Sequence, residues 1–331
     1  MICVMSLKNT YQKHTYNMKR KYILKKGDTG DLVKALQNIL GTVETGVFDD
    51  MTSIYVKRFQ TNANIAVDGI VGPITWKALG FSPAEFYADT DLRTSATWIE
   101  RYPLPEGEYV KRETRKKYIF LHHTAGRSNP YKVIDHWAND QRGRIGTHFV
   151  IGGIDSTLDV NNLGKAKLPH DGKILQAIPD AYFGWHLGPV KSHRMHTGSL
   201  SIELCSAGYL KEKDGKFLTW YGEEVHPSQV EELVKPFRGY KYFHRYSKAQ
   251  LQSLEALLYL LSDKHGIDIS AGLPTMLTGT NNVNGAFEYD PDIDRGRVKG
   301  LLSHTNVRTT KTDIAPQKEM VYLLRRLVPV K

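Results

Sequence analysis

The hydrophobic pattern of the chain changes at residue 116, and this change limits the possible folds more than any other feature of the sequence. Before it, apolar residues recur at the three- and four-residue spacing of amphipathic helices, as in residues 32–40. After it, a continuous apolar run at residues 118–121 ends in His122 and His123. Such a run, followed by alternating helix and strand signals, is typical of buried strands in an α/β domain. The sequence therefore predicts a helical module followed by an α/β domain.

The first module is predicted to be a three-helix domain over residues 22–80. Its second helix is expected to place Ile54, Tyr55 and Phe59 on the apolar face. Pro73 suits the first position of the third helix, where a backbone N–H would have no partner in the helix.

Two glycine-containing turns, residues 46–49 and 69–73, have similar sequences and indicate a short internal repeat in this module. The second turn lies in the segment VDGIVGPITW, residues 67–76. Together with the apolar and glycine positions of residues 24–40 and 46–60, this segment resembles the peptidoglycan-binding domain found at the ends of many cell-wall hydrolases. The resemblance implies that peptidoglycan is a partner of the first module.

The two predicted domains are joined by residues 81–114. This stretch mixes proline, charged and aromatic residues without a sustained period, so we predict a linker that packs partly on its neighbours. The α/β domain is predicted to occupy residues 115–331, with an irregular polar insertion near residues 153–169 and further insertions near 209–246 and 274–295.

The charge balance points to an anionic partner. Among 331 residues, Lys and Arg outnumber Asp and Glu by 45 to 35, which gives a net charge of +10. This excess alone does not distinguish nucleic acid from an anionic cell envelope. The sequence contains no basic stripe with interleaved aromatic residues, so we expect no nucleic-acid partner.

Cysteine content and hydropathy exclude two further classes of protein. Only Cys3 and Cys205 are present, which excludes a disulfide-stapled scaffold and an all-cysteine zinc site. No segment approaches the roughly 20 apolar residues that span a bilayer, so membrane insertion is not expected. The first 21 residues also lack the apolar core of a secretory signal peptide.

Candidate metal ligands lie at predicted strand ends. His122 ends the strand that begins the α/β domain, and open α/β sheets carry their active residues at such carboxyl ends. His304 follows the apolar run at residues 298–302, and Asp313 comes nine positions later. Two imidazoles and one carboxylate are typical of a catalytic zinc site. From the residues alone, many other combinations of histidine and aspartate remain open.

The sequence around these candidates narrows the choice. Five blocks in the chain resemble the zinc-dependent N-acetylmuramoyl-L-alanine amidase family, which includes phage endolysins, bacterial amidases and peptidoglycan recognition proteins. The blocks are IFLHHTA at 119–125, THFVI at 147–151, HDGKILQ at 170–176, GWHLG at 184–188 followed by SLSIEL at 199–204, and SHT at 303–305 with KTD at 311–313. The resemblance implies a central mixed β-sheet flanked by helices.

The resemblance also implies a role for each matching residue. His122, His304 and Asp313 are expected to bind Zn2+. Glu203 matches the acidic residue that handles the proton of the attacking water, and Lys311 matches a basic residue that stabilises the developing oxyanion. In addition, His148, Trp185 and His186 are expected to contact the substrate or to support the site. Thr147 stands where some members of the family carry a tyrosine, so the proton transfer is assigned to Glu203.

The implied activity is hydrolysis of the amide bond between N-acetylmuramic acid and L-alanine. Without a signal peptide but with a wall-binding module, the chain resembles a phage endolysin, which is expected to be monomeric and to accumulate in the host cytoplasm before it reaches the wall. A bacterial or prophage autolysin, and a non-catalytic peptidoglycan recognition protein, are the alternatives.

Overall fold

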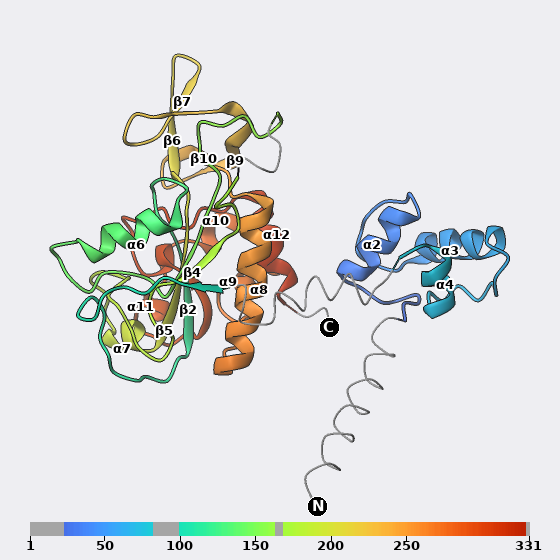
Figure 1. The fold of residues 1–331 in the computed structure, drawn as a ribbon, viewed down its shortest axis with the longest axis horizontal. Coiled ribbons are helices and arrows are strands. Elements are labelled where there is room, and N and C mark those ends of the chain that lie inside the picture. The colour runs from blue at the N-terminus through green and yellow to red at the C-terminus, as the bar shows by residue number, and fades with distance from the viewer. Residues whose placement is uncertain (1–22, 82–98, 163–167, 329–331) are drawn as a thin grey trace, which may run out of the picture. The chain divides into compact units, whose positions relative to one another are not determined.

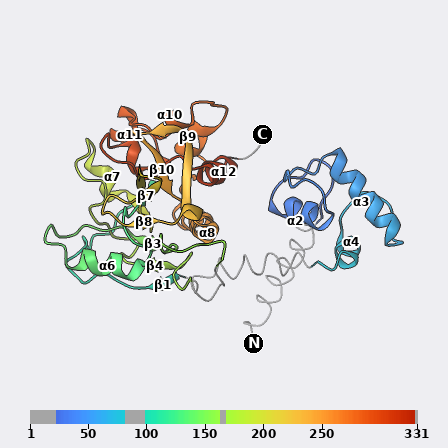
Figure 2. The same ribbon diagram turned by 90° about the horizontal axis from the view of Figure 1, so that it is seen from above.

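The computed structural model describes residues 23–81, 99–162 and 168–328 (Figure 1, Figure 2). The chain divides into two compact units between Arg93 and Thr94. The amino-terminal segment, to which the prediction about a signal peptide refers, and residues 82–98 of the predicted linker lie outside the described ranges. None of the described helices is both long enough and apolar enough to cross a bilayer.

The first unit contains the three predicted helices: α2 (Asp31–Ile39), α3 (Asp50–Asn62) and α4 (Pro73–Ala78). Helix α3 begins where it does because the Asp49 side chain accepts a hydrogen bond from the backbone N–H of Thr52. Pro73 occupies the first turn of α4, as predicted. The helices enclose a small core whose fully buried members include Val33, Leu36, Phe48 and Val71.

The buried face of α3 differs from the prediction. Ile54 is 57% exposed, whereas α3 buries Thr52, Val56 and Gln60. The prediction was wrong because counting apolar residues overlooks a buried amide whose hydrogen bonds are all satisfied inside the fold. Gln60 is such a residue.

Gln60 and Gln37 occupy equivalent positions in an internal repeat of 23 residues. The Gln37 amide nitrogen donates to Thr45 Oγ1, Val47 O and Thr52 Oγ1 at 2.9 Å each, and its oxygen accepts from Gly46 N–H at 2.8 Å. The Gln60 amide repeats these contacts with Asp68 Oδ1, Ile70 O, Thr75 Oγ1 and Gly69 N–H, at 2.8, 2.9, 3.2 and 2.9 Å. Each glutamine therefore closes one glycine turn onto one helix, and the repeat indicated by the two turns is confirmed.

We expect Gln60→Met to destabilise the first unit by about 1–3 kcal/mol, because the buried Gly69 N–H loses its partner and the Ile70 carbonyl keeps only the Thr75 hydroxyl as a donor. Hydrogen exchange on the full chain should show faster exchange in residues 23–81 and no change in residues 99–328. Arg58→Met, an exposed position on the same helix, is the control. Equal protection in Gln60→Met and Arg58→Met would contradict this role of the amide.

The second unit is built on a six-stranded mixed sheet, which confirms the predicted fold class. The spatial order is β1–β4–β3–β5–β2–β11, and only β3 and β4 pair in antiparallel fashion. The strands are β1 (Ile99–Arg101), β2 (Tyr118–His123), β3 (Phe149–Ile151), β4 (Ile174–Gln176), β5 (Ser199–Leu204) and β11 (Gly300–Ser303). Because β2, β3, β5 and β11 are parallel, their carboxyl ends lie along one edge of the sheet.

Helices cover both faces of this sheet (Figure 1, Figure 2). On one face the core joins Leu121 and Ile202 to the long helix α8 and to the carboxyl-terminal helix α12. On the other face, Phe120 and Val150 pack towards the shorter helices α6, α7 and α11. The helices of this unit are α6 (Pro130–Ala138), α7 (His193–Thr197), α8 (Lys248–His265), α9 (Leu273–Leu277), α10 (Val283–Ala286), α11 (Pro291–Asp294) and α12 (Lys318–Arg326).

The predicted insertion at residues 209–246 forms a second sheet of its own (Figure 1). This inserted sheet is antiparallel, in the order β8–β7–β6–β10–β9. Its strands are β6 (Tyr209–Lys213), β7 (Lys216–Leu218), β8 (Glu224–Val225), β9 (Val230–Phe237) and β10 (Tyr240–His244). It leaves the main sheet just after β5, at the edge where the carboxyl ends of the strands lie.

The carboxyl-terminal part of the predicted linker, residues 81–114, belongs to the second unit and not to a linker. Ile99–Arg101 forms β1, which pairs with β4 at the edge of the main sheet. Leu104 is buried, and Val110 forms a bridge with Phe183. A three-residue strand leaves no detectable alternation in the sequence, so only its pairing partner reveals it.

Candidate metal centre and active site

Three of the predicted site residues meet at the carboxyl edge of the main sheet. His122 is near the end of β2, and His304 follows the last residue of β11. These two strands are paired neighbours, with Leu121 opposite Ser303. Asp313 lies in the loop before α12, held by a hydrogen bond from Thr305 N–H to the Asp313 carbonyl at 3.1 Å. Parallel pairing thus brings together residues that are 182 positions apart in the chain.

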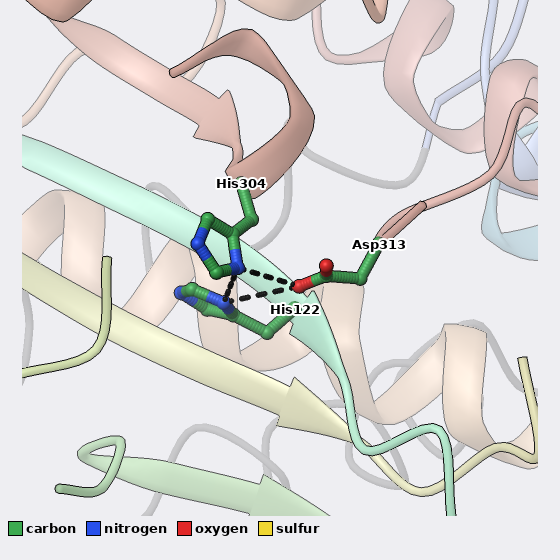
Figure 3. Close-up of side chains that lie close together, drawn as sticks. All are labelled: His122, His304 and Asp313. Atoms are coloured by element: carbon green, nitrogen blue, oxygen red, sulfur yellow. Dashed lines mark hydrogen bonds and ion pairs between the residues drawn. The ribbon is translucent and has the colours of Figure 1, made fainter. Parts of the chain in front are cut away.

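The three side chains of this trio point toward one another, and their candidate ligand atoms lie close together (Figure 3). His122 Nδ1 lies 3.1 Å from His304 Nδ1, and Asp313 Oδ2 lies 3.3 Å from the first nitrogen and 2.9 Å from the second. All three side chains are buried. Two nitrogens and one carboxylate oxygen so arranged can hold a metal ion.

The environment keeps His122 and Asp313 in the protonation states that metal ligands need. Burial lowers the pKa of His122 to about 4, and the nearby Asp313 opposes this shift only in part. Burial disfavours ionisation of Asp313, but the charge of His304 and hydrogen bonds from both imidazoles outweigh it and hold the pKa well below its usual value. Near neutral pH the site therefore offers a neutral imidazole and a carboxylate.

A buried chain of hydrogen-bonded polar groups starts at the second ring nitrogen of His122, the one that does not face the metal trio. His122 Nε2 lies 3.0 Å from His186 Nδ1, and His186 Nε2 lies 2.7 Å from Ser199 Oγ. Ser199 Oγ in turn donates to the carbonyl of His196 at 3.2 Å. Both ring nitrogens of His186 have partners in this chain, an arrangement suited to orienting His122.

Glu203 stands beside His122 in the sheet, because residues 122 and 203 are paired neighbours on β2 and β5. Neighbouring residues in register point to the same face, so the Glu203 carboxylate shares the face of the metal candidates. Burial, together with the charge of Asp313, raises the pKa of Glu203 to about 8, and Lys311 acts in the opposite sense. Within the described residues, no side chain or backbone group hydrogen-bonds to this carboxylate. It is a buried, unpaired acid placed next to a metal candidate, which is typical of an acid–base group.

Lys311 is exposed, and its charge acts on the pKa of both His122 and Glu203. It lies in the segment between His304 and Asp313, which we call the ligand loop (residues 304–313). The position of this loop determines where Asp313 and Lys311 stand relative to the strand ends.

Arg238, in the turn between β9 and β10 of the inserted sheet, holds the ligand loop. The guanidinium donates to several carbonyls of the loop and pairs with one carboxylate. Its partners are Arg308 O at 2.8 Å, Lys311 O at 3.1 Å, Thr305 O at 3.1 Å, Thr309 O, and Glu288 Oε2 at 2.9 Å. Sequence reasoning missed this residue, because a single arginine in an insertion carries no pattern that links it to a loop 70 positions away.

We expect Arg238→Met to loosen the ligand loop, because four carbonyls lose a charged donor at once. Hydrogen exchange of peptides covering residues 304–313 should become faster by roughly tenfold or more. Lys241→Met removes an exposed ion pair with Glu232 on the same sheet and is the control. Unchanged exchange in Arg238→Met would show that other contacts hold the loop.

Two residues that were expected to contact the substrate or to support the site, His148 and Trp185, lie apart from the metal trio. His148 is completely buried, with Ser201 Oγ at 2.9 Å from one ring nitrogen and the Tyr182 carbonyl at 2.9 Å from the other. Of the two roles expected for His148, this buried position favours support over contact with a substrate, because strand position indicates a face of the sheet but not whether a covering segment seals it. Trp185 packs against His196 with ring centroids 4.9 Å apart, and faces a separate pocket described below.

The chain belongs to the N-acetylmuramoyl-L-alanine amidase family, whose match spans residues 112–313. Residues 29–79 match the family described as putative peptidoglycan binding domain. A stretch of 95 residues, 26% of this chain, is 41% identical to N-acetylmuramoyl-L-alanine amidase CwlL from Bacillus licheniformis and covers 25% of that protein. A stretch of 70 residues, 19% of this chain, is 37% identical to an uncharacterized protein in the bpoA1 3′ region of Kitasatospora aureofaciens and covers 59% of it. The matches thus span about a quarter and about three-fifths of these relatives.

Solved structures with a similar arrangement include PlyL and a derivative of AmpD. PlyL has a TM-score of 0.39 and 11% identity, over 70% of this chain and 97% of that chain. The AmpD derivative has a TM-score of 0.36 and 15% identity, over 72% of this chain and 98% of that chain.

Proposed function

We propose that the protein is a zinc-dependent amidase that cleaves the bond between N-acetylmuramic acid and L-alanine in peptidoglycan. The observation that carries this proposal is the convergence of His122, His304 and Asp313 beside the buried, unpaired carboxylate of Glu203, in a chain of the amidase family. A metal trio without a neighbouring acid would suit binding alone. The acid beside it favours hydrolysis.

The donor set fits zinc. A tetrahedral zinc ion with bonds of about 2.0–2.1 Å holds its ligand atoms roughly 3.3 Å apart, and the three separations here are 3.1, 2.9 and 3.3 Å. With the metal on Nδ1, each imidazole must carry its proton on Nε2. His122 then donates to His186 Nδ1, and His304 donates to the Leu187 carbonyl at 3.2 Å, so both rings have the acceptor that this tautomer needs.

The chain's own residues supply the proton transfer and the charge stabilisation. When bound, zinc polarises the scissile carbonyl and lowers the pKa of water towards about 7. In its carboxylate form, which the positive charge of a bound metal would favour, Glu203 accepts the proton of the attacking water and delivers it to the leaving amine, so that it acts first as base and then as acid. The Lys311 ammonium stabilises the negative charge that develops on the carbonyl oxygen in the transition state.

The first unit is proposed to dock the enzyme on the wall, which raises the local concentration of the second unit near its substrate. This proposal is supported by the match of residues 29–79 to a peptidoglycan-binding family. An endolysin, acting on the wall of a host cell during lysis, is the setting that best combines a docking unit with an amidase unit. A monomer suffices for this arrangement, because the metal trio and Glu203 come from one chain.

Purified sacculi treated with the zinc-loaded protein should release L-alanine amino termini without new reducing sugar ends. The first product identifies an amidase, and the absence of the second excludes a glycosidase. The apo protein, prepared with a chelator, is the control and should release neither. If the loaded protein binds sacculi and releases no amine at any pH tested, the chain is a recognition protein and the proposed activity is wrong.

A further inference from the structure

A pocket lined by arginine and aromatic side chains lies at the opposite end of the main-sheet strands from the metal trio. Its volume is about 430 Å³, within the range of small-ligand sites. The residues that give it chemical character are Arg112, Arg144, Arg194, His193, Phe183 and Trp185. We call it the arginine pocket.

The strand directions place the arginine pocket at the amino ends of the parallel strands, whereas the metal trio lies at their carboxyl ends. Arg112, Arg144 and Arg194 precede β2, β3 and β5 respectively, so they lie at the amino ends of these parallel strands. His122 and Glu203 lie at the carboxyl ends. The length of the strands therefore lies between the three arginines and these two residues. The pocket is therefore no subsite for the groups that flank the scissile bond.

Buried rings also separate the pocket from the trio. The ring centroid of Trp185 is 4.9 Å from that of His196, His196 is 5.6 Å from His186, and His186 is 5.1 Å from His122. His196 and His186 are both buried, and they lie between Trp185, which lines the pocket, and His122 of the metal trio.

The charge of the pocket is unbalanced. None of the three arginines forms an ion pair with a carboxylate among the described residues. Arg144 is anchored by a hydrogen bond from Nε to the Gly107 carbonyl at 3.2 Å, and its backbone N–H donates to Glu108 at 3.3 Å, which leaves both terminal nitrogens of the guanidinium for a ligand. The Arg112 guanidinium lies 5.2 Å above the ring centroid of Phe183. Three guanidinium groups around one pocket that has no lining carboxylate select an anion.

We propose that the arginine pocket binds phosphodiester groups of an anionic wall polymer. Guanidinium groups match the oxygens of a phosphate in paired hydrogen bonds. The partly exposed ring of Trp185, on which His193 stacks with ring centroids 5.1 Å apart, suits the carbon skeleton of an attached polyol or sugar, and a polymer repeats such units along its length. The choice of a wall polymer over nucleic acid rests on the proposed function, whereas the binding of phosphate does not.

Calorimetric titration of the full chain with inorganic phosphate and with poly(glycerol phosphate) tests this proposal. The triple variant Arg112→Gln, Arg144→Gln, Arg194→Gln should bind the polymer at least about tenfold more weakly than the wild type. The control variant Lys132→Gln, Lys211→Gln, Lys248→Gln removes the same charge from exposed positions outside the pocket. It should bind within about twofold of the wild type, and excess inorganic phosphate should compete with the polymer for the wild type.

Three results would overturn the proposal. Equal weakening in the lysine variant would show that overall charge alone attracts the polymer. Equally tight binding of poly-L-glutamate would show that the pocket does not select phosphate. Duplex DNA that binds more tightly than poly(glycerol phosphate), and loses this affinity in the arginine variant, would assign the pocket to nucleic acid. Hydrolysis of a soluble muropeptide by the arginine variant should equal that of the wild type, so a failure of the amidase proposal is seen separately.

Discussion

Glu203→Gln is expected to lower the turnover of amide hydrolysis by about 10²–10⁴-fold, while zinc content and binding to sacculi stay at the wild-type level. Glutamine keeps the shape of the side chain but cannot accept a proton from water. Glu203→Ala should be equally inactive, because the loss is one of chemistry and not of packing. Turnover on a soluble muropeptide, with zinc measured in the same sample, checks both variants. Glu113→Gln, an exposed carboxylate in the same unit, is the control.

The same substitution is expected to stabilise the metal-free chain. The pKa of Glu203 is raised from 4.5 to about 8, so between these values the folded chain holds a proton that the unfolded chain has lost. Stability then falls as the pH rises through this range, and the loss is absent below pH 4.5. Metal-free Glu203→Gln should therefore melt at a higher temperature than the wild type at pH 7.5 and at nearly the same temperature at pH 4. Retained turnover in Glu203→Gln would remove Glu203 from the mechanism.

Asp313→Asn is expected to abolish zinc binding and, with it, turnover. The substitution keeps the size of the side chain but replaces a carboxylate by a neutral amide, which is a poor zinc ligand. It also removes the anion on which both imidazoles converge. Metal analysis after dialysis against zinc should give about one zinc per chain for the wild type and close to none for the variant.

Asp263→Asn, at an exposed position of α8, should behave like the wild type in this measurement. Circular dichroism confirms that the variant retains its fold. A folded Asp313→Asn chain with a full complement of zinc would show that the ion is held elsewhere, and would contradict the trio as its site.

The parts of the site that were predictable from the sequence are those whose signal is local. Residues 118–123 form β2 as predicted, because an apolar run of this length reports a buried strand without reference to any partner. Position at a strand end then singled out His122 and His304. That the two meet depends on the pairing of β2 with β11, and the residues alone left other pairs open until the family resemblance selected this one.

Predictions that depended on tertiary contacts were less successful. The spacing of apolar residues predicted that Ile54 lies on the buried face of α3, but Gln60 is buried there instead. Its amide oxygen accepts a hydrogen bond from the backbone N–H of Gly69, 9 positions away. His148 was expected to contact the substrate or to support the site, and strand position did not reveal that Ser201 and the Tyr182 carbonyl occupy both of its ring nitrogens. Arg238 lies in a turn of the inserted sheet, and nothing in the sequence indicates that this residue hydrogen-bonds to the ligand loop.

By itself, the sequence determined the kinds of element, the strand-end position of His122, and through its motifs the family to which the chain belongs. These follow from spacing within a few residues, where the backbone geometry of helices and strands leaves little choice. Only the tertiary structure decided that β2 and β11 are neighbours, that Glu203 stands unpaired beside His122, and that three arginines gather at the far edge. Such contacts join residues many positions apart, and packing, not local spacing, selects them.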